Sequence, residues 1–235
     1  MRIEITQILH KKNLLSAVVP VYRNQETLET LYNSLSPLFH EIIFVNDASP
    51  DSSAKILDLL ALKDPKVHVI HLEKNLGQNR AILKGLEACK GERAVILDAD
   101  LQDPVDAIPR LLEKMGGDFD AVFAGKCGSY ESKSRLCASK IFKRCLHWIA
   151  KTPLDAGLFA ALSRKMIERV LKMAPYSSYV VGMIGLARLP ICSIAVERRV
   201  RENGVSAYSI WGRLKLGILA IFHTLRLRRV FTKYL

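Results

Sequence analysis

The sequence predicts an α/β fold in which helices flank a mainly parallel β-sheet. Short apolar runs alternate along the chain with segments whose apolar residues have helical spacing, the order expected for parallel strands joined by helices. Apolar residues make up 49% of the 235 residues, enough for a large core. Clusters of polar residues directly follow several of the apolar runs, as expected where strands leave a sheet.

The elements of this fold can be placed from their apolar patterns and turn residues. The predicted strands span residues 14–21, 41–45, 67–72, 94–97 and 119–124. The predicted helices between and after them cover residues 25–35, 54–62, 81–89 and 108–115. In the basic half, residues 133–151 and 210–225 are predicted to form two further, amphipathic helices.

Four polar clusters follow the predicted strands, at residues 20–22, 46–47, 75–78 and 98–102. The carboxyl ends of parallel strands lie at one edge of a sheet, and ligands of such sheets bind there. The clusters therefore predict a site at that edge. Polar loops would also occur there without any function, because loops are generally polar.

The stretch Ala94 to Pro104 dominates the sequence, because an apolar run ends abruptly in the carboxylates Asp98, Asp100 and Asp103. A tight turn after Asp98 would bring Asp98 and Asp100 toward one point, and paired carboxylates suit Mg²⁺ or Mn²⁺. The alternative is that both are solvated loop acids and that Asp103 begins the next helix. No glycine-rich dinucleotide motif, P-loop or metal-spaced histidine pair is present.

The net charge of +12 is unevenly distributed. Residues 1–124 carry a net charge of −4, and residues 125–235 carry +16. The basic half therefore suits an anionic partner, and no nucleic-acid-reading motif accompanies the charge.

Both predicted amphipathic helices combine basic residues with an apolar face, a pattern typical of peripheral binding to an anionic membrane. The apolar residues of the first are Leu136, Ile141, Cys145, Leu146 and Ile149. Those of the second are Trp211, Leu214, Ile218, Ile221, Phe222 and Leu225. Alternatively, each helix packs its apolar face on its own domain and leaves its charges in solvent.

Neither a signal-peptide pattern nor an apolar stretch of about 18 residues occurs, so we expect the chain not to cross a bilayer unaided. The five cysteines form no C-x-x-C pair, which favours a reducing environment. We therefore expect a cytoplasmic protein bound peripherally to the inner face of the membrane.

Six motifs in order resemble the family-2 inverting glycosyltransferases of the GT-A fold, and most of all the polyprenyl-phosphate group. The motifs are Val-Val-Pro-Val-Tyr at 18–22, Phe-Val-Asn-Asp-Ala-Ser-Pro-Asp at 44–51, Asn-Leu-Gly-Gln at 75–78, Leu-Asp-Ala-Asp-Leu-Gln-Asp-Pro at 97–104, Asp-Ala-Gly at 155–157 and Arg-Glu-Asn-Gly-Val-Ser-Ala-Tyr at 201–208. The resemblance implies one GT-A domain over residues 1–235. Within it, residues 1–124 would bind the nucleotide sugar, and the basic residues 125–235 would face the acceptor and the membrane.

The resemblance also implies a reaction and its ligands. A sugar would move, with inversion, from a UDP- or GDP-linked donor to a polyprenyl phosphate at the cytoplasmic membrane face. A divalent cation and an arginine would stabilise the charge on the leaving nucleoside diphosphate. The acceptor phosphate is already anionic, so no strong general base is required.

The roles of individual residues follow from the same resemblance. Pro20, Tyr22, Asp47, Gly77, Asp98, Ala99 and Ser206 would bind substrate, with Asp47 on the base. Asp98, Asp100 and Gln102 would hold Mg²⁺ or Mn²⁺ on the diphosphate. Asp155 and Arg201 are the predicted catalytic residues, Asp155 as a base or orienting group and Arg201 with Ser206 near phosphates.

Two cationic positions of the family pattern are Ala161 and Ala207 here. Two alternatives therefore stay open beside a lipid-linked acceptor. One is a glycosyltransferase with a soluble or saccharide acceptor. The other is a degenerate, non-catalytic member that binds a membrane or a partner.

Overall fold

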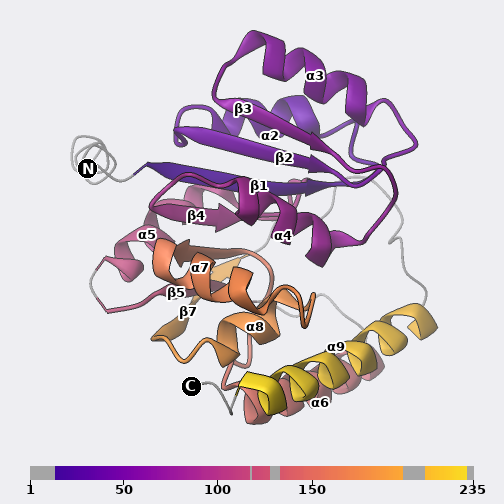
Figure 1. The fold of residues 1–235 in the computed structure, drawn as a ribbon, viewed down its shortest axis with the longest axis vertical. Coiled ribbons are helices and arrows are strands. Elements are labelled where there is room, and N and C mark those ends of the chain that lie inside the picture. The colour runs from indigo at the N-terminus through magenta and orange to yellow at the C-terminus, as the bar shows by residue number, and fades with distance from the viewer. Residues whose placement is uncertain (1–13, 117, 128–132, 198–209, 232–235) are drawn as a thin grey trace.

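The computed structural model describes residues 14–116, 118–127, 133–197 and 210–231. Its centre is a seven-stranded sheet with strand order β3-β2-β1-β4-β6-β5-β7 (Figure 1). The strands are β1 (Leu15–Val21), β2 (Glu41–Asn46), β3 (Val67–His71), β4 (Arg93–Ile96), β5 (Ala121–Cys127), β6 (Ala160–Ser163) and β7 (Ile191–Glu197). The predicted mainly parallel sheet is confirmed, and β6 alone among these strands runs antiparallel to its neighbours, β4 and β5.

Helices cover both faces of the sheet, because side chains that alternate along a strand point to opposite faces. On one face, Ala17, Val19 and Val21 of β1 share a core with α2 (Leu28–Leu35), α3 (Ser53–Lys63) and α5 (Ile108–Met115). On the other, Val18 shares a core with α4 (Gln78–Ala88), α7 (Arg164–Met173) and α8 (Val180–Leu186). A short 3₁₀ turn, η1 (Val105–Ala107), precedes α5.

The predicted elements of the first half are confirmed, with shifts of one to three residues at most ends. The region after α6 (Lys133–Ala150) contains β6, α7, α8 and β7, none of which we predicted. The strand β6 has only four residues and its apolar run is short, so its place in the sheet comes from pairing with β4 and β5 rather than from its own pattern.

The last helix, α9 (Ile210–Phe231), lies beside α6 at one end of the molecule (Figure 1). It is longer than predicted, and of its side chains between residues 217 and 230, those of Ala220, Thr224 and Leu227 are buried. Three residues of the predicted apolar face are exposed, Ile218 and Phe222 at 60% each and Leu225 at 40%, whereas the side chains of Trp211 and Leu214 lie outside the described part of the chain. The alternative in which the apolar face packs on the protein's own domain therefore does not hold for Ile218 and Phe222, whereas the predicted apolar residues Leu146 and Ile149 of α6 are buried.

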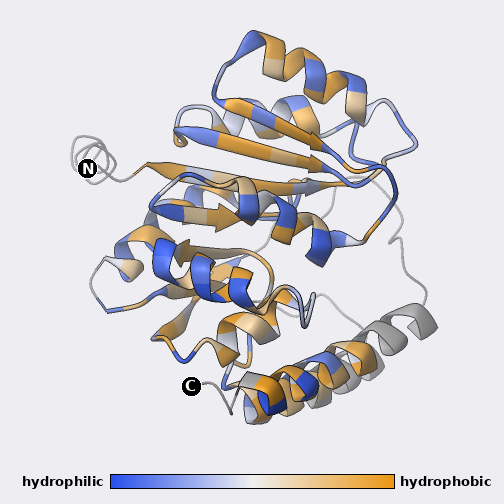
Figure 2. Ribbon diagram, viewed as in Figure 1, coloured by the Kyte–Doolittle hydropathy of each residue, from blue (hydrophilic) through white to orange (hydrophobic). Residues whose placement is uncertain are grey.

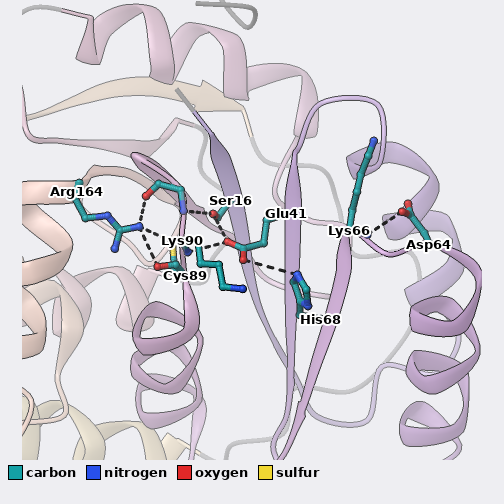
Figure 3. A network of polar contacts seen from close by, with 9 residues as sticks. Ser16, Glu41, Asp64, Lys66, His68, Cys89, Lys90 and Arg164 are labelled. Carbon is teal, nitrogen blue, oxygen red and sulfur yellow. Dashed lines mark hydrogen bonds and ion pairs between the residues drawn. The ribbon is translucent and has the colours of Figure 1, made fainter. Parts of the chain in front are cut away.

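A polar network closes the amino edge of the sheet (Figure 3). Glu41, at the start of β2, accepts hydrogen bonds from Ser16 Oγ (2.5 Å) and the backbone N–H of Lys90 (3.0 Å). Arg164, directly after the antiparallel β6, donates to the carbonyls of Cys89 and Gly91. These contacts join β1, β2, β4 and β6 at the edge opposite to the strand ends that carry the predicted site.

Candidate active site

The predicted site residues gather at the carboxyl edge of the sheet, because β1, β2, β3 and β4 are parallel and end there. The strands β5 and β7 are parallel to each other and antiparallel to β6, so they end at the same edge. The antiparallel β6 begins there. Asp155, a few residues before β6, is therefore brought to the edge where Asp47 and Asp98 lie, although it follows no strand in the sequence.

Asp155 packs directly against β5. A Cβ atom placed on Gly125 would overlap the carboxylate of Asp155, so glycine is required at this strand position for close approach. The side chain of Asp155 is half-buried. The role of Asp155 in catalysis remains a prediction. Its carboxylate lies against Gly125 of β5, at the sheet edge that carries the predicted site.

The loop that follows β4 is shaped by its own acids. Asp103, 3% exposed, accepts a hydrogen bond from the backbone N–H of Asp98 (2.9 Å). Asp100 Oδ1 accepts from the backbone N–H of Gln102 (3.1 Å), and Leu101 adopts a positive φ of 60°. The predicted turn after Asp98 is thus present, and Asp98 and Asp100 are both half-buried within it.

These residues fit a divalent cation shared with a substrate. In the part of the chain that the structure describes, no group of three His, Cys, Asp or Glu side chains could hold a metal alone. Mg²⁺ and Mn²⁺ are commonly held by one or two carboxylates, with substrate phosphates completing the shell. The donor set of Asp98, Asp100 and Gln102 matches that pattern, and its role in metal binding remains a prediction.

Asp47 is 2% exposed and directly follows β2. Its two carboxylate oxygens accept the backbone N–H groups of Leu76 (2.6 Å) and Gly77 (2.8 Å). Gly77 has a φ of 86°, a conformation that favours glycine, which explains this residue at the turn into α4. Asp47 therefore orders the 75–77 segment, and contact with a base, our prediction, would use further lone pairs of the same carboxylate.

The segment after β1 is tied to the segment after β2. Pro20 is buried within β1, and Tyr22 is 37% exposed, with the guanidinium carbon of Arg23 5.4 Å from its ring centroid. The backbone N–H of Arg23 donates to Ser49 Oγ (2.7 Å). Asp51 accepts from Ser49 Oγ (2.6 Å) and from the backbone N–H of Gln25 (3.2 Å).

The charge of Asp51 is stabilised by this network. Partial burial opposes ionisation, but hydrogen bonds from Ser49, Ser53 and Gln25 outweigh it and lower the pKa of the Asp51 carboxyl group. The ionised carboxylate thus holds two loops of the predicted nucleotide pocket together.

Sequence reasoning missed two contacts that organise the metal loop. Thr27 Oγ1 donates to the backbone carbonyl of Ala99 (2.5 Å), joining the start of α2 to this loop. Gln78 Nε2 donates to Asp98 Oδ1 (2.6 Å) from the first residue of α4. Gln78 stood in the predicted polar cluster at 75–78, but its partner lies 20 residues away and no local pattern links them.

Other predicted residues lie elsewhere or outside the description. Arg201, Ser206 and Ala207 lie outside the described residues. Ala161 is fully buried in β6, where it pairs with Val95 of β4 and Val122 of β5. A pocket lined by Glu92, Arg93, Asp120, Ser163, Arg164, Lys165 and Glu168 lies at the amino edge, away from the predicted site.

Hydrophobic and hydrophilic residues are interspersed along the described parts of α6 and α9 (Figure 2), and several of the large apolar ones are exposed. We call the exposed residues of α9, together with Trp148 of α6, the helix-pair surface. They are Trp148, Ile218, Leu219, Phe222, Leu225, Arg226, Arg228 and Arg229. Trp148 is 72% exposed and was not among the predicted apolar residues. Within the described ranges, no helix is both long and apolar enough to span a bilayer.

Comparison with known proteins agrees with this architecture. A bactoprenol glucosyl transferase of Shigella phage SfX is 29% identical over 226 residues, which cover 91% of this chain and 74% of the relative. An undecaprenyl-phosphate 4-deoxy-4-formamido-L-arabinose transferase of Pseudomonas fluorescens is 33% identical over 206 residues, 83% of this chain and 60% of the relative.

The fold is that of solved GT-A structures. The crystal structure of glucosyl-3-phosphoglycerate synthase from Mycobacterium tuberculosis, in complex with Mn²⁺, UDP and phosphoglyceric acid, superposes with a TM-score of 0.67 at 19% identity. The match covers 95% of this chain and 82% of that one. The family model for glycosyl transferase family 2 matches residues 16–171, which carry five of the six motifs and all of the described site, and the chain therefore belongs to this family.

Proposed function

We propose that this protein transfers a sugar, with inversion, from a nucleotide sugar to a polyprenyl phosphate at the cytoplasmic face of a membrane. The observation that carries the proposal is the meeting of Asp47, Asp98, Asp100 and Asp155 at one sheet edge. Their order and motifs are those of the family to which the chain belongs. The relatives named for transfer to bactoprenol or undecaprenyl phosphate support the acceptor.

In this proposal the segments after β1, β2 and β3 bind the nucleotide. Tyr22 and Asp47 would flank the base. Gly77 would keep the segment after β3 in place through its φ of 86°, a conformation that favours glycine. Asp98, Asp100 and Gln102 would hold Mg²⁺ or Mn²⁺ against the diphosphate. When bound, the cation supplies positive charge that stabilises the leaving nucleoside diphosphate.

The chain's own residues then orient the acceptor. The nucleophile is an oxygen of the lipid phosphate, which is anionic at neutral pH and needs no proton removed. Asp155, held against Gly125, would orient the sugar relative to that oxygen for attack opposite the leaving group. Arg201 and Ser206 are proposed to meet the phosphates.

The helix-pair surface supports peripheral membrane binding. Its Arg226, Arg228 and Arg229 follow the exposed Ile218, Phe222 and Leu225 along one helix, the composition of segments that bind at an anionic lipid interface. An acceptor lipid whose phosphate lies at the membrane surface would then be within reach of a protein docked there.

The test is transfer of labelled sugar. The purified protein is incubated with Mn²⁺, undecaprenyl phosphate in mixed micelles and a panel of UDP- and GDP-linked radiolabelled sugars, and the products are extracted into butanol. We expect label from one donor to enter the organic phase only when the lipid phosphate is present. Label transferred to a water-soluble product would indicate the soluble-acceptor alternative. Absence of turnover with every donor, in a protein that binds vesicles, would indicate the non-catalytic alternative.

A further inference from the structure

One contact joins the predicted metal loop to the opposite side of the nucleotide pocket. Gln78 Nε2 lies 2.6 Å from Asp98 Oδ1. An ionised carboxylate only accepts hydrogen bonds, so the side-chain amide of Gln78 donates through its NH₂ group. A hydrogen bond to a charged acceptor is stronger and more directional than one between neutral groups.

The position of Gln78 is set by the two residues that precede it and by their contacts with Asp47. Gln78 is the first residue of α4, and the two residues before it, Leu76 and Gly77, donate their backbone N–H groups to the buried carboxylate of Asp47. The positive φ of Gly77 turns the chain into the helix at this point. The start of α4, and with it Gln78, is thereby fixed relative to β2.

Asp98 is held from its other side by the loop. Its backbone N–H donates to Asp103, which is buried. Asp98 thus has a fixed backbone, and its side chain receives a donor from a helix that begins 20 residues earlier. The carboxylate orientation is therefore set jointly by the loop after β4 and by the start of α4.

Fold stability alone does not account for Gln78. The side chain of Gln78 is solvent-exposed, and exposed polar pairs contribute little to the free energy of unfolding. By contrast, groups that hydrogen-bond to the ligands of a metal orient those ligands, and their loss commonly weakens metal binding by about 10- to 100-fold.

We propose that Gln78 is a positioning residue that orients the Asp98 carboxylate for the cation and diphosphate. This inference rests on the proposed function, because it takes Asp98 to face the metal. Gln78 itself need not touch the cation or the donor. Its effect passes through the hydrogen bond to Asp98.

The experiment measures Mn²⁺ binding directly. The Mn²⁺ concentration that half-saturates the protein is obtained by electron paramagnetic resonance of free Mn²⁺, at a fixed saturating concentration of UDP or GDP, whichever stabilises the wild-type protein. For Gln78→Ala we expect this concentration to rise about tenfold, at the lower end of such effects. The melting temperature without ligand and the metal-free affinity for the nucleotide should be unchanged.

The matched control is Lys84→Ala on the same helix. Lys84 contacts Glu87 through an exposed pair (2.7 Å) and is far along α4 from the site, so its removal tests general effects on the helix. We expect wild-type Mn²⁺ binding for this variant. A rise as large as that of Gln78→Ala would overturn the inference.

A double-mutant cycle tests the route through Asp98. In an Asp98→Asn background, Gln78→Ala should have no further effect on Mn²⁺ binding, because the positioned carboxylate is already lost. Additive effects would show that Gln78 acts independently of Asp98. An equal loss of nucleotide affinity with and without metal would show that it contacts the donor directly, and either result overturns the inference.

Mn²⁺ binding by the wild-type protein distinguishes failure of the proposed function from failure of the role of Gln78. If the wild-type protein binds no Mn²⁺ in the presence of either nucleotide, the metal-dependent function fails. If the wild-type protein binds Mn²⁺ and Gln78→Ala binds it equally well, only the role of Gln78 fails.

Discussion

Gly125 on β5 and Asp155 before β6 fit together so closely that a methyl group on the glycine would overlap the carboxylate. The contact crosses from a strand to the segment that enters its antiparallel neighbour. It places an acid at the carboxyl edge of a sheet whose other acids follow parallel strands. The position of Asp155 thus depends on Gly125 having no side chain.

Gly125→Ala should therefore displace the Asp155 carboxylate. Misplacement of a reacting or orienting group by about 1 Å is able to lower turnover by about 100-fold, so we expect sugar transfer to fall by 10- to 100-fold. Gly217→Ala on α9 is the control, because a Cβ at Gly217 would meet only the ring of Phe142, at an ordinary contact distance of 3.5 Å. Steady-state transfer rates of both variants give the answer, and full activity of Gly125→Ala would contradict the role of Asp155.

Asp100→Ala should abolish Mn²⁺-dependent donor binding while leaving the melting temperature within a few degrees of the wild-type value. A half-buried loop acid contributes little to the core, so its loss acts mainly on the ligand. Calorimetric titration of the donor with and without Mn²⁺ measures the effect. Asp118→Ala, an exposed acid before β5 at the other sheet edge, serves as the control. Wild-type transfer by Asp100→Ala would refute the metal assignment.

Asp47→Ala should weaken nucleotide binding by roughly 5- to 150-fold. The substitution removes the acceptor that we propose for the base. It also leaves the backbone N–H groups of Leu76 and Gly77 without their hydrogen-bond acceptor, and an unpaired buried donor costs about 1 to 3 kcal/mol. The melting temperature should fall as well, because the backbone contacts belong to the folded state. Binding of the nucleotide is measured by calorimetry in the absence of metal. An unchanged affinity would place the nucleotide elsewhere.

Asp51→Asn should lower stability in a pH-dependent way. The folded pKa of Asp51 lies below the unfolded value of 3.8, so its ionised form stabilises the protein above that pH. The contribution is lost as the pH falls through the lower, folded pKa. Melting curves of wild type and variant should differ most at neutral pH and converge in acid below pH 3.8. A difference in melting temperature that stays constant from neutral pH into acid would contradict the lowered pKa of Asp51.

Binding to anionic vesicles should have a salt-sensitive and a salt-resistant part. Each Lys or Arg near the surface contributes about 1 kcal/mol, which salt screens, whereas insertion of Ile218 and Phe222 does not depend on salt. Ile218→Glu combined with Phe222→Glu should remove the salt-resistant part in a flotation assay. Both side chains are 60% exposed, so the fold should survive.

The control for the vesicle experiment is Leu62→Glu, an 86% exposed apolar residue on α3. It should float as the wild type does at both salt concentrations. A wild-type protein that never floats with anionic vesicles would refute peripheral binding and favour a soluble acceptor.

The sequence by itself determined the parallel half of the sheet and the acids that follow its strands. Runs such as 42–45 and 94–97 are apolar throughout because both faces of the strand are covered, and this pattern is local. The sequence offered a turn after Asp98 as one of two alternatives, and the residue that holds this turn, Asp103, lies within the same loop. Membership of the family followed from motifs that are short and contiguous.

Only the tertiary structure decided which distant residues meet. The antiparallel β6 has no distinct pattern, because it is a four-residue insertion between β4 and β5, and its pairing brings Asp155 to the edge. The contacts of Gln78 with Asp98 and of Asp155 with Gly125 join residues 20 and 30 positions apart. On α9, periodicity indicated an apolar face that includes Ile218 and Phe222, but among the described side chains of this helix the buried ones are Ala220, Thr224 and Leu227. Helical spacing shows which residues share a face, whereas the neighbours that the fold provides decide which face is covered.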